Sequence, residues 1–236
     1  LVLAARIAAG QTTELDRYVA QPDPAYSYRL VRRLPGLGYT AHILELTSQT
    51  WRAPAEVDRP QWRHWLTVVV PSAVRTPTGL LLISGGSNDD PPPSATDAIL
   101  VGTAAAAAGA IVAELRQMPN QPLRFQDESR RRSEDALIAY TWDKYLRTGD
   151  ATWPAQLPMT KAAVRAMDAV TAFSRSPEAG GHTVDRFVVT GASKRGWTTW
   201  LTAAVDRRVV GIIPLVIDVL NVEPSFLHHW RAYGFW

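Results

Sequence analysis

Residues 186–205 join a short apolar run to an amphipathic helix through a turn of small residues. RFVVT at 186–190 has the apolar, β-branched character of a buried strand. Apolar residues then recur at helical spacing over 194–205, namely Trp197, Trp200, Leu201, Ala204 and Val205. Gly191 and Ala192 leave room for a sharp turn before Ser193. A strand that turns directly into a helix restricts the chain to folds in which helices pack against a sheet.

The rest of the chain alternates between the same two patterns. We expect strands at 26–34, 39–51, 64–71, 79–84, 110–115 and 209–217, and helices at 95–108, 133–147 and 158–173. The first two strands flank PGLG and should pair as a hairpin. The polar stretch 116–132 predicts a loop across the sheet edge, with Arg130–Arg132 as a solvated part of the loop or a helix start. The alternation predicts an α/β fold with N-terminal antiparallel strands, a mainly parallel sheet, and helices on both faces.

Composition narrows the class of protein. The 236 residues are 46% hydrophobic, enough for one large core, and 25 basic against 22 acidic residues give a net charge of only +3. No basic patch favours a nucleic acid, and no run reaches the ~20 apolar residues that span a membrane. Cysteine is absent, and neither H-x-x-x-H nor H-E-x-x-H spacing occurs. We therefore expect no disulfide, no metal and no cofactor.

The turn at Ser193 has the features of a nucleophile elbow. In such a turn a strained backbone lifts a serine hydroxyl above the carboxyl edge of the sheet, beside a helix N-terminus that favours an oxyanion. We expect Ser193 to be the nucleophile and the N–H of Lys194 to be one oxyanion donor. Gly85–Gly86, after the run GLLLIS, predict a second donor loop, and taken alone they fit a flexible glycine turn equally well. The usual G-x-S-x-G spacing is broken, because Arg195 takes the second glycine position and Gly196 follows it.

Two other interpretations compete with the elbow. The turn can be a structural strand-to-helix connection without chemistry. TGAS also occurs in the phosphate-binding turn of short-chain dehydrogenases, and Tyr140 and Lys144 have the Y-x-x-x-K spacing of their catalytic pair. The dehydrogenase interpretation fails, because Arg195 and Trp197 stand where dinucleotide binding needs glycine. The tyrosine–lysine pair also precedes the turn instead of following it.

A serine nucleophile also needs an acid and a base. Asp218 follows the run VVGIIPLVI and should lie at the same sheet edge as Ser193, so its carboxylate is the expected acid. Asn221 and Glu223 are near alternatives, and Asp218 can equally be an ordinary loop or cap residue.

The base is harder to place among the five histidines. Three lie upstream of the elbow in the chain: His42, His64 and His182. His228 and His229 follow the acid in the expected order. In this arrangement, however, the histidine normally follows the last strand, and only one strand is expected after the elbow. We therefore expect the catalytic histidine to lie beyond Trp236 and the chain alone to be inactive.

The run VVTGASKRGWTTWLTAAVDRRVVGIIPLVIDVLN resembles the central block of the PhoPQ-activated pathogenicity-related protein family. WLTVVVPSAV, LLLISGGSN, LRQMPNQPL and HHWRAYGFW resemble the same family, from about Leu15 onward. The resemblance implies an exported, bacterial, α/β-hydrolase-like protein. The G-x-S-[KR]-x-G form of the elbow is similar to that of glucuronoyl esterases. This similarity implies Ser193 as nucleophile, Lys194 as the residue after it, and Asp218 as the acid.

The resemblance also bears on domain organisation, because chains of this family continue with further strands. It implies a C-terminally truncated fragment, in which 15–236 is an incomplete α/β-hydrolase domain and 1–14 a signal-peptide remnant or N-terminal arm. We expect an exported serine hydrolase, an esterase or a peptidase, that acts on an ester or amide. The alternative is a non-catalytic binding or signalling protein, with some of the nine tryptophans forming a recognition surface. No partner protein can be identified.

Overall fold

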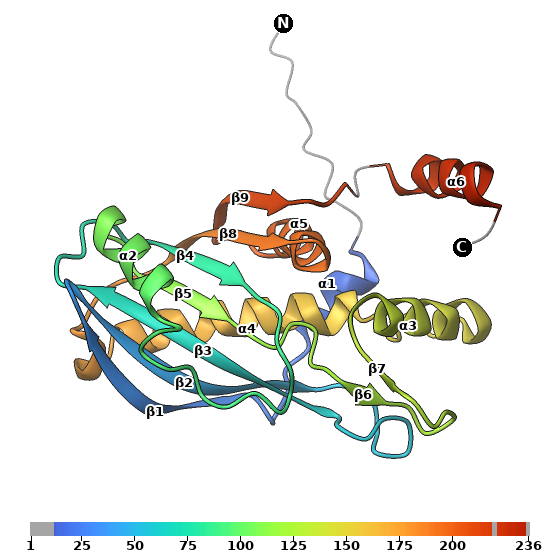
Figure 1. Cartoon of the computed structure of the whole chain (residues 1–236), viewed down its shortest axis with the longest axis horizontal. Helices are drawn as coiled ribbons and strands as arrows, with labels where there is room; N and C mark the ends of the chain where they lie inside the picture. Colours follow the sequence, from blue (N-terminus) through green and yellow to red (C-terminus); the bar gives the residue numbers. More distant parts are fainter. Residues whose placement is uncertain (1–11, 219–220, 235–236) are drawn as a thin grey trace, which may run out of the picture.

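A computed structural model describes residues 12–218 and 221–234, which contain a seven-stranded mixed sheet (Figure 1). Its strands lie in the order β1-β2-β3-β5-β4-β8-β9. Their bounds are β1 Ser27–Gly36, β2 Tyr39–Thr50, β3 Gln61–Pro71, β4 Thr78–Ile83, β5 Val112–Leu115, β8 Arg186–Ala192 and β9 Val209–Leu215. Antiparallel pairs join β1 to β2, β2 to β3 and β3 to β5, whereas β5, β4, β8 and β9 run parallel. The expected combination of N-terminal antiparallel strands and a parallel sheet is confirmed.

The hairpin of β1 and β2 forms where the turn residues predicted it. Gly36 pairs with Tyr39, so Leu37 and Gly38 make the reversal. Gly38 has φ 77°, a conformation that glycine reaches without steric cost. A two-residue turn therefore sets the register of both long strands.

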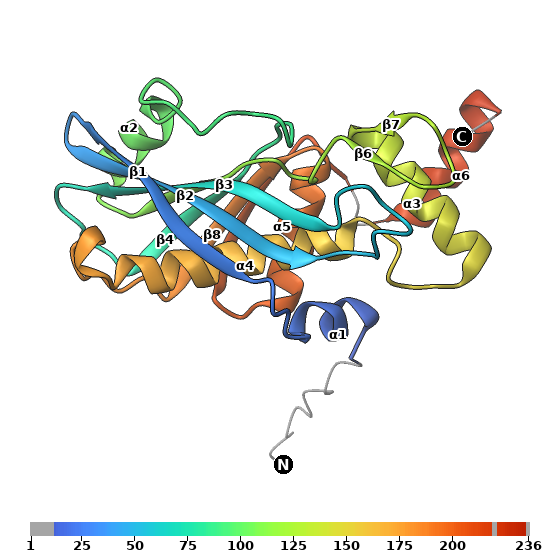
Figure 2. The same ribbon diagram turned by 90° about the horizontal axis from the view of Figure 1, so that it is seen from below.

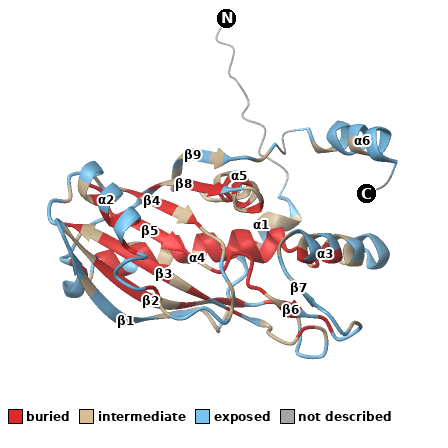
Figure 3. Ribbon diagram, in the orientation of Figure 1, coloured by how far each residue is buried: buried red, intermediate tan, exposed pale blue. Residues whose placement is uncertain are grey.

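Helices cover both faces of the sheet (Figure 2). On one face α2 (Ile99–Ala108) packs over a small apolar cluster of Ala41, Val69, Ala98, Val101, Ala105 and Val112. On the other face lie α4 (Gln156–Ser174) and α5 (Lys194–Val205). The α4 helix is buried along almost its whole length (Figure 3). The short α1 (Glu14–Ala20) packs against α4. This layered architecture confirms the expected α/β class.

The carboxyl ends of the parallel strands meet at one edge. Ile83 of β4 is opposite Gly191 of β8, and Ala192 of β8 is opposite Leu215 of β9. The segments that follow these strands therefore begin side by side. They carry the expected site residues Gly85, Gly86, Ser193, Lys194 and Asp218.

Some boundaries differ from those expected. The α2 helix begins at Ile99, four residues late, because Ser94 and Asp97 close a separate turn in which the Ser94 N–H donates to the Asp97 carboxylate at 2.8 Å. The α4 helix begins two residues before Pro158, and α3 spans Glu134–Thr148, close to its expected range. The aromatic-rich segment near the C-terminus forms α6 (Val222–Tyr233), which has no buried residue (Figure 3). Across the described ranges, no helix has the length and apolar character to cross a membrane.

Residues 116–132 do more than cross the sheet edge. They form a small hairpin of β6 (Leu123–Arg124) with β7 (Arg131–Arg132). Arg132, expected to be solvated, has only 15% of its side chain exposed, since it pairs with Glu128 and lies 4.7 Å over the Tyr140 ring. The prediction for Arg132 was wrong, because an ion pair and an aromatic face allow this guanidinium to be covered.

Tryptophans contribute to an aromatic cluster in the core beside this hairpin. Trp51, Trp62 and Trp153 are at most 6% exposed. Trp51 packs edge to face against both other indoles and against Phe125. These three tryptophans therefore stabilise the core and do not form a recognition surface.

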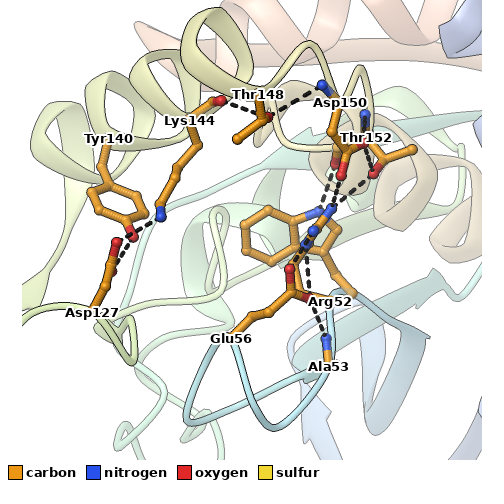
Figure 4. A network of polar contacts seen from close by, with 10 residues as sticks. Arg52, Ala53, Glu56, Asp127, Tyr140, Lys144, Thr148, Asp150 and Thr152 are labelled. Carbon is orange, nitrogen blue, oxygen red and sulfur yellow. Dashed lines mark hydrogen bonds and ion pairs between the residues drawn. The ribbon is translucent and has the colours of Figure 1, made fainter.

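Arg52 and Lys144, which both lie over the Trp153 ring, form ion pairs with neighbouring carboxylates (Figure 4). Arg52 pairs with Glu56 and, at 2.8 Å, with Asp150. Nearby, the Lys144 ammonium donates to Asp127 at 2.6 Å. The two groups tie the loop after β2 to the segment that follows α3, and the loop after β6 to α3 itself.

Candidate active site

Ser193 lies in the turn between β8 and α5. Its φ of 57° and ψ of −125° fall outside the regions that residues other than glycine normally occupy. The Ser193 N–H donates to the Leu215 carbonyl of β9 at 2.9 Å, which holds the turn against the neighbouring strand. Strained residues persist only where the surrounding structure holds them, and they concentrate at functional sites. A nucleophile elbow requires a strained strand-to-helix turn of this kind, and the role of Ser193 stays a prediction.

Two glycines make this turn possible. A Cβ on Gly191 would lie 2.7 Å from the Arg195 carbonyl oxygen. A Cβ on Gly196 would lie 2.5 Å from Ile217 and 2.9 Å from the Leu215 carbonyl oxygen. The glycine that the G-x-S-x-G spacing requires is thus replaced in function by Gly196, one residue later. The displacement leaves position 195 free to carry a long side chain.

The loop after β4 lies against that side chain. A Cβ on Gly85 would approach the Arg195 guanidinium to 2.8 Å, and Gly86 has φ 130°. The Gln117 N–H donates to the Gly85 carbonyl at 2.8 Å, and the Gln121 side-chain amide donates to the Gly86 carbonyl at 3.2 Å. The expected second donor loop therefore lies beside the elbow and is held by the segment that follows β5.

A partly buried ion-pair group lies beside the elbow, and its central residue, Glu134, was not predicted from the sequence. The Glu134 carboxylate accepts from the Lys194 ammonium at 2.6 Å and from the Arg195 guanidinium at 2.8 and 2.5 Å. Burial by itself raises the pKa of Glu134, but hydrogen bonds from Arg195, Lys194 and Gln121 outweigh it and bring the pKa to about 2. In the sequence, Glu134 is an ordinary acidic residue at a helix start, which gives no signal of this role.

A sequence model of the PhoPQ-activated pathogenicity-related protein family matches residues 15–236. The chain belongs to this family. The resemblance of the sequence motifs is thereby confirmed. Autocrine proliferation repressor protein A of Dictyostelium discoideum is 42% identical to this PhoPQ-related chain over 237 residues, which cover 100% of this chain and 47% of that protein. The chain thus spans about half the length of the curated relative it matches.

Solved structures resemble the PhoPQ-related chain in fold. An acetyl xylan esterase from Paenibacillus sp. R4 has a TM-score of 0.53 at 14% identity, over 93% of this chain and 65% of that one. A glucuronoyl esterase from Solibacter usitatus has a TM-score of 0.48 at 17% identity, over 86% and 57%. At such identities the first likeness establishes the α/β-hydrolase-like fold alone.

The expected acid of this PhoPQ-related chain lies past the end of β9. That strand ends at Leu215, earlier than expected, because Val216 has φ 45° and leaves the extended conformation. Asp218 follows in an exposed position at the carboxyl edge. Asn221 occupies the N-cap position of α6, and Glu223 lies in its first turn. The role of Asp218 stays a prediction.

Two of the histidines are buried in the sheet. His64 on β3 has Ser48 Oγ 3.0 Å from Nε2 and the Arg116 carbonyl 3.1 Å from Nδ1. Burial lowers the pKa of His64 to about 4, so it is neutral near pH 7. His42 on β2 packs edge to face against Phe173, and burial lowers its pKa as well. Both histidines thus pack between the sheet and the segments that cover it.

The other histidines lie at two separate places. His182 precedes β8 whereas Ser193 follows it, so the length of this strand separates them. His228 and His229 lie on α6, where the His229 ring contacts Tyr233 at 4.7 Å. The expected position of the catalytic histidine, beyond Trp236, stays a prediction for this family member.

A cavity of about 490 Å³, lined mainly by residues of polar or charged type, opens between β3 and the loops after β4 and β5. Several of its groups are engaged with the framework, since Gln117 accepts from the Trp65 N–H at 2.7 Å and Asn120 donates to the Arg63 carbonyl at 2.8 Å. Ser193 is not among its lining residues. Over 12–218 and 221–234, no three histidine or carboxylate side chains gather as a metal site.

Proposed function

We propose that this PhoPQ-related chain carries the nucleophile of an exported serine hydrolase, an esterase or a peptidase that acts on an ester or amide. The backbone of Ser193, with φ 57° and ψ −125° between a parallel strand and a helix, is the observation that carries the proposal. The neighbouring glycines and the loop after β4 add to it, because they build the surroundings that an acyl-transfer site needs.

The proposed reaction uses the residues around this turn. The Ser193 hydroxyl attacks the substrate carbonyl and passes its proton to a histidine base, which returns the proton to the leaving group. The Lys194 N–H and an N–H of Gly85–Gly86 stabilise the oxyanion, and Asp218 orients the base. Water then hydrolyses the acyl-enzyme and regenerates the serine.

Between an ester and an amide, the fold shared with an acetyl xylan esterase favours an ester of a carboxylic acid. Export rests on the family resemblance and on the small apolar residues at the start of the chain. Detection of the native protein in the culture medium or envelope fraction, compared with a cytoplasmic marker, tests that part.

A fluorophosphonate probe tests the nucleophile in the complete protein. We expect labelling under native conditions that is abolished in Ser193→Ala and by prior unfolding. Ser225→Ala, at an exposed serine on α6, is the matched control and should label like the wild type. Absence of labelling in the folded wild type, or full labelling of Ser193→Ala, would refute the proposal.

A second candidate follows from the name of the relative. Autocrine proliferation repressor protein A is 42% identical to this chain, so a signalling role that needs no catalysis is the alternative. The two functions are separated by adding purified wild type and Ser193→Ala to proliferating cells of the source organism. Equal repression of growth by both proteins would favour signalling, whereas loss in Ser193→Ala would favour hydrolysis.

A further inference from the structure

We infer that Glu134 is a positioning residue that holds the loop after β4 in register with the nucleophile elbow. The inference rests on the proposed function, because the two held segments are those that would donate hydrogen bonds to the oxyanion. Glu134 itself begins α3 and belongs to neither segment. It acts through the side chains that connect them.

On the elbow side, Glu134 binds the two residues that follow Ser193. Lys194 and Arg195 both direct their charged groups at its carboxylate, and their side chains are only 10% and 12% exposed. The Arg195 Nε also donates to the Met118 carbonyl at 2.5 Å. Both cations are therefore largely withdrawn from solvent. Arg195 pairs with Glu134, whereas Lys194 pairs with Glu134 at 2.6 Å and with the exposed Asp135 at 3.1 Å.

On the loop side, Glu134 acts through Gln121. The Gln121 amide nitrogen donates to the Glu134 carboxylate at 2.5 Å and to the Gly86 carbonyl at 3.2 Å. In return, the Glu134 N–H donates to the Gln121 amide oxygen at 2.7 Å. The Arg195 guanidinium meanwhile lies against Gly85. One carboxylate thus reaches both glycines of the loop, each through a single intervening side chain.

The backbone of Glu134 is also strained, with φ 51°. Residues other than glycine are sterically disfavoured at positive φ, and the reciprocal hydrogen bonds with Gln121 hold Glu134 in this conformation. Oxyanion donors act only when they lie about 2.7–3.1 Å from the developing charge. A shift of about 1 Å between catalytic groups can lower the rate about 100-fold. Loosening this connection should therefore slow acyl transfer without removing any reacting group.

The test uses Glu134→Gln in the complete protein, with Glu128→Gln as its matched control. Glu128 forms a comparable ion pair with Arg132 but has no contact with the elbow or with Gly85–Gly86 among the described residues. Hydrogen exchange is measured over residues 84–88 and 191–197. We expect exchange in both segments to accelerate at least about tenfold in Glu134→Gln and to stay unchanged in Glu128→Gln.

The catalytic consequence is read from fluorophosphonate labelling and from kcat and KM with an aryl ester. Glu134→Gln should lower the labelling rate and kcat by about 10- to 100-fold with KM changed less than about twofold. Glu134→Asp, which keeps the charge on a shorter side chain, should recover part of the loss.

The outcomes separate the two proposals. The inference is overturned if hydrogen exchange in Glu134→Gln matches that of the wild type in both segments. It is also overturned if the wild type is labelled and Glu134→Gln is labelled at the same rate. A wild type that is never labelled overturns the proposed function, and exchange alone then decides whether Glu134 holds the two segments together. If Glu134→Gln and Glu128→Gln lower the Tm equally and neither speeds up local exchange, the ion pairs of Glu134 contribute to overall stability and do not position the two segments.

Discussion

The close approach at Gly196 predicts a large effect from a single methyl group. In Gly196→Ala the new Cβ would meet Ile217 Cγ2 at 2.5 Å, the Leu215 carbonyl oxygen at 2.9 Å and the Gly191 carbonyl oxygen at 3.0 Å. Two of these atoms belong to the backbone of β8 and β9, so relief requires α5 to move away from the sheet. Ser193 lies at the start of that helix and would move with it.

The change in the free energy of unfolding of Gly196→Ala combines a gain in helix propensity with a cost of overpacking. Alanine is favoured over glycine by about 1 kcal/mol in a helix interior, which is an upper limit for Gly196 in the first turn of α5. Overpacking typically costs about 1–3 kcal/mol, and immobile backbone partners place this site at the upper end or above. We expect a net loss of about 1–3 kcal/mol in the free energy of unfolding, which corresponds to a fall in Tm of about 3–10 °C for a chain of this size.

The assay is urea unfolding of the complete protein, together with fluorophosphonate labelling. Gly211→Ala, on β9, is the matched control, because its Cβ would lie 3.5 Å from Val188, an ordinary contact. That variant should be as stable as the wild type or slightly more stable, and fully labelled. If Gly196→Ala were instead about 1 kcal/mol more stable than the wild type, the higher helix propensity of alanine would explain the whole change. The close approach of the Gly196 Cα to β8 and β9 would then be refuted.

Three further predictions concern other parts of the chain. Glu134 has a pKa of about 2, below its ordinary value of 4.5, so its ion pairs stabilise the fold fully above pH 4.5 and this stabilisation is lost as the pH falls toward 2. The free energy of unfolding of Glu134→Gln should therefore fall less steeply than that of the wild type between pH 5 and 2. The same pH profile for both proteins in urea unfolding would contradict this pKa. Thr13 and Asp16 form a capping box at α1, so Thr13→Ala should cost about 1 kcal/mol in urea unfolding, whereas no loss would mean that the cap is not formed. Trp51 donates its indole N–H to the Thr152 carbonyl at 3.1 Å, whereas the buried Trp62 indole N–H has no hydrogen-bond partner. Trp51→Phe should therefore lower the free energy of unfolding by about 1 kcal/mol more than Trp62→Phe does, and the reverse order would contradict this hydrogen-bond assignment.

Elements with strong local signals were predictable from the sequence. The apolar runs that became β4, β5 and β8, and the amphipathic spacing of α5, are set by residues that are neighbours in the chain. Gly109 ends α2 in the left-handed conformation expected of a C-terminal glycine. Features that depend on how side chains and backbone settle in the folded chain were not predictable. Arg132 is largely covered because it pairs with Glu128 and lies over the Tyr140 ring, and β9 ends early because Val216 leaves the extended conformation.

The candidate site divides in the same way. Ser193 could be singled out because a strand, two small residues and a helix are consecutive in the chain. The reason that Gly196 substitutes for the expected glycine became visible only with β9 in place, since the atoms that exclude a side chain there belong to Leu215 and Ile217.

The sequence by itself determined that this protein has an α/β fold and a serine on a sharp strand-to-helix turn, because local spacing carries that information. The tertiary structure alone decided what surrounds the serine. Glu134 is sixty residues from Lys194 in the chain, yet its carboxylate lies 2.6 Å from the Lys194 ammonium. No periodicity or motif connects residues so far apart. Their contact exists because α3 begins at the edge where β4 and β8 end, and that edge forms only when the sheet is assembled.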